Sequence, residues 1–186
     1  IQSIGCTSVI TSGPFSYTVY ANPYFQILVD VTGIGNFTLP YYDLGTYTGT
    51  IDWGDGNVTA NTYANRNHIY ASEGQYTITI DGTISDFNFG IYADYFNGDE
   101  TPDALIEIKN WGTGFSFGLF GGSIVGFGYG AFDKCHNLVE ITAADVPDFT
   151  GITNLNGMFN ECTNFIGGAS MASWDTSGIT NMGAMF

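Results

Sequence analysis

Residues 151–159 read GITNLNGMF, and residues 178–186 read GITNMGAMF, 27 positions further along the chain. The same period occurs one copy earlier, because Phe132, Phe159 and Phe186 are successively 27 residues apart. Other residues recur at this spacing in phases of their own: Val125, Ile152 and Ile179; Cys135 and Cys162; Asn137 and Asn164; Leu138 and Phe165. Apolar residues that return at a fixed period predict a repeat array, in which each repeat buries its face against its neighbours.

A period between about 20 and 29 residues is typical of leucine-rich repeats. The stretches IVGFGYGAFDKCHNLVEI at 124–141, GMFNECTNF at 157–165 and WDTSGITNMGAMF at 174–186 resemble the BspA-like leucine-rich repeats of bacterial, protist and viral surface proteins. The resemblance covers roughly residues 102–186 and implies a surface-displayed, non-enzymatic scaffold for adhesion or recognition. We therefore expect a leucine-rich-repeat solenoid with a period of about 27 residues. Its repeated positions are Phe132, Cys135, Phe159, Cys162 and Phe186.

The first half of the chain has a different pattern. Short alternating runs such as SYTVYA, FQILVDV, TYTGTIDW and QYTITIDG are separated by Gly, Pro and Asn, which predicts an antiparallel β-sandwich. Within it, IDWGDGNVT at 51–59 and HIYASEGQYTITIDG at 68–82 resemble the PKD domain, an immunoglobulin-like sandwich of extracellular proteins. The matched residues are Asp52, Trp53, Gly54, Asp55, Gly56, His68, Tyr70, Gly74, Tyr76 and Ile80.

The Asp55-Gly56 step predicts a tight turn with positive φ. We expect Trp53, beside this turn, to lie in the sandwich core close to Tyr76.

These patterns predict a mainly β protein: a PKD-like sandwich at 1–83, an acidic junction at 84–101 and a solenoid at 102–186. The final copy stops at GAMF where the preceding copy continues as NECTNF, which leaves Met182, Met185 and Phe186 uncovered. Because a solenoid end needs a cap or a neighbour, we expect further repeats or an abutting subunit after Phe186.

Charge excludes several classes of partner. The chain has 18 acidic residues and three basic ones, Arg66, Lys109 and Lys134, with a formal net charge of −15. Nucleic acids and anionic membranes are bound through basic patches, which this composition does not supply. No apolar run approaches the roughly 20 residues of a membrane span, so we expect no membrane insertion of this segment.

The cysteines leave two alternatives open. Cys135 and Cys162 share one phase, and strands about 4.8 Å apart would permit a disulfide between them. Small buried residues also stack as ladders inside solenoids, and we favour a buried thiol ladder. Cys6 is either free or a cross-link to another subunit.

No catalytic constellation is evident, and we predict that the chain is not an enzyme. His68 and His136 are the two histidines; we expect the first to be packed and hydrogen-bonded and the second to be exposed on a repeat turn. Asp52 and Asp55 could form a two-carboxylate hydrolase site, but their position on a Trp-Gly-Asp-Gly turn favours a role in turn formation.

A calcium site is the alternative to the expectation that no cofactor is bound. Oxygen ligands crowd the junction at Asp94, Asn97, Asp99, Glu100 and Asp103, as calcium requires, although their order matches no known loop and favours a solvated acidic linker.

The stretch FSFGLFGGSIVGFGYGAF at 115–132 could form a carbohydrate-stacking face, although we favour a place in the solenoid core. Two sequons, at Asn36 and Asn57, would accept glycans in a eukaryotic secretory setting.

We therefore expect an extracellular protein of a cell or virion surface that adheres through multivalent contacts with a protein or glycan on a cell surface. One alternative is a structural subunit of a virion (capsid decoration or fibre) or of an extracellular filament, which would contact copies of itself or the parent particle. Another is an accessory binding module of a secreted hydrolase.

Overall fold

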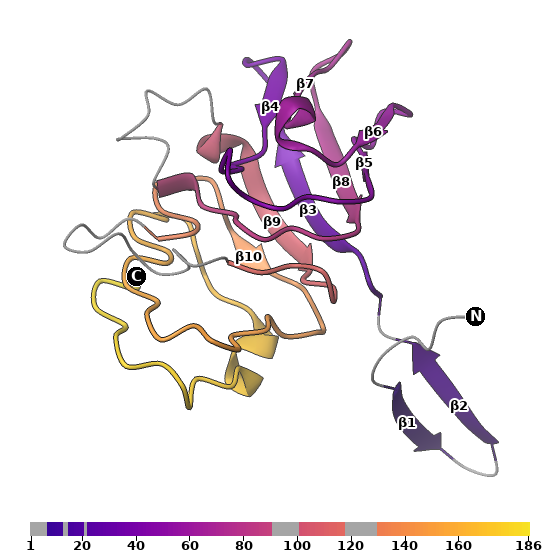
Figure 1. Cartoon of the computed structure of the whole chain (residues 1–186), viewed down its shortest axis with the longest axis vertical. Helices are drawn as coiled ribbons and strands as arrows, with labels where there is room; N and C mark the ends of the chain where they lie inside the picture. Colours follow the sequence, from indigo (N-terminus) through magenta and orange to yellow (C-terminus); the bar gives the residue numbers. More distant parts are fainter. Residues whose placement is uncertain (1–6, 13–14, 21, 91–100, 118–129) are drawn as a thin grey trace.

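The computed structural model describes residues 7–12, 15–20, 22–90, 101–117 and 130–186, and the protein is mainly β (Figure 1). A mixed six-stranded sheet has the order β10-β9-β3-β8-β5-β6. Its strands are β3 (Phe25–Asp30), β5 (Thr50–Asp52), β6 (Val58–Ala60), β8 (Gln75–Asp81), β9 (Leu105–Asn110) and β10 (Glu140–Ile141). Two antiparallel pairs accompany it: β1 (Thr7–Ser12) with β2 (Phe15–Tyr20), and β4 (Asn36–Thr38) with β7 (Asn67–Ile69). Three short 3-10 helices are η1 (Tyr63–Asn65), η2 (Pro102–Ala104) and η3 (Ala169–Ser173).

The central strands alternate between buried and more exposed residues with a period of two. Along β3, Phe25, Ile27 and Val29 are buried, whereas the residues between them are half-buried. The paired strand β8 buries Ile78 and Ile80 in the same layer. Since successive side chains of a strand point to opposite sides of the sheet, one face packs on the core and the other faces away from it.

The sheet runs across the junction between the two halves predicted from the sequence. β9, which follows residue 101, pairs antiparallel with β3, and it pairs in parallel with β10. The register against β3 shifts twice, between Gln26 and Ile27 and between Leu28 and Val29. β3 and β9, which are far apart in the chain, are therefore hydrogen-bonded neighbours in one sheet.

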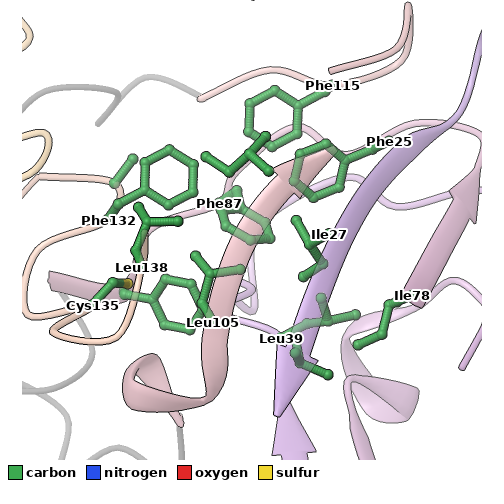
Figure 2. Close-up of a cluster of buried hydrophobic side chains, with 14 of the residues drawn as sticks. Phe25, Ile27, Leu39, Ile78, Phe87, Leu105, Phe115, Phe132, Cys135 and Leu138 are labelled. Carbon is green, nitrogen blue, oxygen red and sulfur yellow. The ribbon is translucent and has the colours of Figure 1, made fainter. Parts of the chain in front are cut away.

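The core is continuous across the same junction. The ring of Phe25 stacks on that of Phe115 with centroids 4.4 Å apart, and Phe87 lies 5.8 Å from Phe132. Figure 2 shows this cluster, in which side chains from β3 and β8 meet Leu105 of β9 and Leu138 of the following segment. The limits of 83 and 102 for the two parts remain a prediction.

The last copies of the period stack in register. The Phe132 and Phe159 rings are 5.4 Å apart and within 8° of parallel, and the Phe159 and Phe186 rings are 5.9 Å apart. The backbone follows the same step, because Phe132 N–H donates to Met158 O and Phe159 N–H donates to Met185 O. The structure buries both Phe132 and Phe159, as their common phase predicts.

The two described cysteines are free thiols inside this stack. Cys162 Sγ donates a hydrogen bond to Phe132 O at 2.9 Å. Burial raises the pKa of the Cys135 thiol well above its ordinary value and raises the pKa of Cys162 to about 12. Cys6 lies outside the described residues. Within the aromatic stretch, Phe115, Phe117 and Phe132 are buried, whereas Phe120, Phe127 and Tyr129 lie outside the described residues.

Truncation of the stacked phenylalanines gives the first prediction. We expect Phe159→Ala to lower the free energy of unfolding by about 3 to 5 kcal/mol, because it opens a cavity beside the stacked, buried Phe132 ring. Phe186→Ala is the matched control, since this ring shares the phase but is 72% exposed; its cost should be about 1 kcal/mol or less. Urea denaturation of both variants measures the difference. Equal losses in the two variants would show that the stack does not depend on the Phe159 ring.

Candidate recognition surface

The face of the six-stranded sheet that points away from the core forms a polar surface across β5, β8, β3, β9 and β10. One row follows the register from Asp52 to Thr79 to Gln26. The next row runs from Thr77 to Leu28, Glu107 and Glu140. All of these side chains are half-buried or exposed. We call this surface the sheet face.

Hydrogen bonds within the sheet face hold several of its side chains in place. Gln26 Nε2 donates to Thr79 Oγ1 at 3.0 Å, and Gln75 Nε2 donates to Asp30 Oδ2 at 3.2 Å. Hydrogen bonds from Thr32 and Gln75 lower the pKa of Asp30. Because these cross-strand hydrogen bonds already hold the side chains, less side-chain conformational entropy is lost when a partner binds.

The part of the sheet face nearest the repeats centres on Glu107. Its carboxylate accepts a hydrogen bond from the Thr142 hydroxyl and lies 3.4 Å from Lys109 Nζ. Glu140 is the neighbour of Glu107 in the parallel ladder. Among the described residues, no side chain forms a hydrogen bond or ion pair with the Glu140 carboxylate.

The sheet face is acidic. It carries five carboxylates, at Asp30, Asp52, Asp81, Glu107 and Glu140, against the single cation of Lys109. Such a surface attracts cationic groups and repels phosphate. Only Asp52 of these residues was a candidate site residue from the sequence. The alternation of FQILVD and QYTITID was the signal for Asp30 and Asp81, but it does not reveal which strands adjoin. Glu107 and Glu140 lie outside these two runs.

The Trp-Gly-Asp-Gly motif forms a tightly bonded turn between β5 and β6. Asp52 Oδ1 accepts from Gly54 N–H at 2.9 Å, and Asp55 Oδ1 accepts from Asn57 N–H at 3.0 Å. Gly54 and Gly56 have φ angles of 81° and 92°, in agreement with the positive φ expected for this turn. Both carboxylates thus stabilise the turn, which is the role favoured over a hydrolase pair.

An aromatic stack anchors this turn to the core. Trp53 is fully buried and stacks on His68, with ring centroids 4.8 Å apart. Tyr70 contacts His68 edge-on, stacks on Tyr76 at 4.2 Å and donates its hydroxyl hydrogen to Trp53 O at 3.1 Å. Ring contacts of His68 and Tyr70 therefore connect Trp53 to Tyr76. Gly74 has a φ of 139°, and its carbonyl oxygen accepts a hydrogen bond from the N–H of Val31, the residue after β3.

His68 is hydrogen-bonded to a carboxylate of the same turn. Its Nε2 lies 2.8 Å from Asp55 Oδ2, and both side chains are largely buried. Burial raises the pKa of Asp55, but the hydrogen bonds from His68 and Asn57 outweigh it and lower that pKa to about 2. The packed, hydrogen-bonded environment expected for His68 is the one the structure shows.

His136 lies at a corner of the repeats, between carboxylates of the preceding and following copies. Its Nδ1 is 2.7 Å from Asp103 Oδ1, and its Nε2 is 3.9 Å from Glu161 Oε2. The ring is 43% exposed, whereas the neighbouring Cys135 thiol is buried in the core. The imidazole is hydrogen-bonded to Asp103, and no hydrogen bond joins it to the buried thiol among the described residues.

The structure tests the calcium candidates only in part. Asp94, Asn97, Asp99 and Glu100 lie outside the described residues, and Asp103 is bound to His136. In the described ranges, no group of three or more His, Cys, Asp or Glu side chains could hold a metal ion.

The sequons lie in different environments. Asn36 is half-buried in β4, and Thr38 of its sequon is fully buried. Asn57 is exposed, and its side chain donates to Asp55 Oδ2 at 3.0 Å.

Comparison with known proteins adds one finding. Residues 129–186 match the family model DUF285, described as a Mycoplasma protein of unknown function. No curated protein and no solved structure matches the chain. Among the described residues, no helix has the length and apolarity needed to cross a membrane.

The hydrogen bonds to Asp55 give a pH-dependent prediction. Because the folded pKa of about 2 lies below the ordinary value of 3.8, the carboxylate stabilises the fold above pH 4 and this contribution disappears between about pH 4 and pH 2. The difference in unfolding free energy between wild type and Asp55→Asn should therefore be larger at pH 4 than at pH 2 and shrink across this window. Urea denaturation at pH 6, 4, 3 and 2 measures it. A difference that stays the same down to pH 2 would contradict the low pKa.

Proposed function

We propose that the chain is a non-enzymatic recognition module of an extracellular surface, in which a PKD-like sandwich is joined to a BspA-like leucine-rich-repeat solenoid. The repeat part of this proposal is supported by the 27-residue period and by the ring and backbone stacking of successive copies. The sandwich part is supported by the Trp53, His68 and Tyr70 stack beneath the Asp-Gly turn.

The observation that carries the proposal is the sheet face. Its strands come from both halves of the chain, and their opposite sides are packed into one core. A surface held by buried strands keeps its side chains in fixed relative positions, which suits repeated contacts with an extended partner. Multivalent contact along such a face raises avidity without any single strong site.

The chemistry of the sheet face limits its partner. Threonine, glutamine and carboxylate side chains offer hydrogen bonds to a protein or a glycan, and the negative charge disfavours nucleic acids and anionic lipids. In this function the PKD-like part supplies β3, β5 and β8 to the face, and the repeats extend it by β9 and β10. No catalytic group and no cofactor take part.

Bead adhesion tests the proposal. Beads coated with the protein should be retained on at least one of immobilised fibronectin, laminin, type I collagen and mucin. Thr77→Arg, in the middle of the sheet face, should lower the retained fraction by about tenfold, because it places a long cation among the partner's contacts.

Thr150→Arg is the control, since Thr150 is exposed in a turn outside the sheet face. Circular dichroism should show the same fold in both variants. The proposal fails if no coated surface retains the beads, or if both variants are retained as well as wild type. Retention that depends on copies of the protein binding one another would support a structural subunit instead.

A further inference from the structure

Three aliphatic residues form a stripe along successive rungs of the repeats. Val139 N–H donates to Ile106 O, and Ile166 N–H donates to Val139 O, each at 2.8 Å. Parallel rungs lie about 4.8 Å apart, so the three residues follow one another across the edge of the sheet. We call Ile106, Val139 and Ile166 the aliphatic stripe.

The aliphatic stripe is accessible to solvent. Val139 is 37% exposed and Ile166 is 77% exposed, and Ile106 is half-buried and lies outside the buried core. Leu28, the register partner of Glu107 on β3, is also half-buried outside that core. Contiguous exposed apolar side chains with a polar border are typical of interaction sites, whereas single ones need no explanation.

Carboxylates border the aliphatic stripe on two adjacent rungs. Glu107 follows Ile106, and Glu140 follows Val139, in the same register. Each pair lies between two buried residues, Leu105 and Ile108 on one rung and Leu138 and Ile141 on the next, so the strict alternation of sides is interrupted and both members of each pair are partly exposed. On β9 the interruption is the register shift between Leu28 and Val29, which makes Ile106 an extra residue in the ladder. Glu107 already binds Thr142 and Lys109. Glu140 binds no other described side chain, so its charge remains available to a partner. The aliphatic stripe and the Glu140 carboxylate together favour a ligand that has apolar and cationic groups side by side.

We propose that the aliphatic stripe, with Glu140 beside it, binds an amphipathic, cationic segment of a partner protein. This inference rests on the proposed recognition function and names the class of its partner. Aliphatic side chains of the segment would cover Val139 and Ile166, and a lysine or arginine would pair with Glu140. Neutral glycans lack the cation, and anionic lipids and nucleic acids carry the wrong charge.

A synthetic peptide tests this partner chemistry directly. The probe is a fluorescein-labelled octapeptide in which valine and lysine alternate, and its binding to the whole chain is followed by fluorescence anisotropy. Peptides with glutamate in place of lysine, or with serine in place of valine, should bind at least about tenfold more weakly. Binding should also weaken as salt rises from about 0.05 M to about 0.5 M.

Two pairs of variants locate the site. Ile166→Ser and Glu140→Gln should each weaken binding by about five- to tenfold. Ile69→Ser is the control for the first, because Ile69 is 76% exposed on β7. Glu73→Gln is the control for the second, because Glu73 is exposed in the turn before β8. The controls should bind as wild type does, and thermal melts should show that all four variants fold.

Several results would overturn the inference. They are the absence of peptide binding, equal binding of the glutamate peptide, and equal losses in the site and control variants. A concentration-dependent dimer that Ile166→Ser disperses in sedimentation experiments would assign the stripe to a second copy of the chain. If the beads are retained on a protein or mucin surface while the peptide does not bind, only this inference fails and the recognition function stands.

Discussion

The pairing of β9 with β3 is the interaction on which the rest of the structure depends. It places Ile108 opposite Ile27 and Leu105 opposite Val29, and these side chains fill the layer between the first strands and the repeats. Because β9 also pairs in parallel with β10, the same strand belongs to an antiparallel sheet on one side and to the repeat ladder on the other. Without it, neither half would cover the apolar edge of the other.

The same constraint creates the surface. A strand whose inner side chains are buried must direct the intervening ones outward, so the ladder that fixes Ile108 also aligns Glu107 with Glu140. The stack of Phe132 on Phe159 sets the spacing of the copies, and that spacing carries Val139 and Ile166 to successive rungs. Core packing and recognition surface therefore share one geometry, with polar residues on the sheet face and aliphatic residues at its edge.

Local patterns predict part of this arrangement. The return of GITN and MF at 27 residues predicted the repeated burial of Phe132 and Phe159, and the Asp-Gly turn predicted the positive φ of Gly56. The β9–β3 contact could not be predicted, since Leu28 and Glu107 are 79 positions apart and alternation says nothing about which strands adjoin. For the same reason the sheet face was missed. Glu140 is unremarkable in the sequence and becomes notable only beside Glu107 and the exposed Val139.

The central claim is that one sheet and one core join the two halves of the chain. Differential scanning calorimetry tests it most directly, because halves that share β9 and the surrounding aromatic core must unfold together. We predict a single transition whose calorimetric and van't Hoff enthalpies have a ratio of about 1. Two resolved transitions, or a ratio well above 1, would show that the halves unfold independently and would contradict the account.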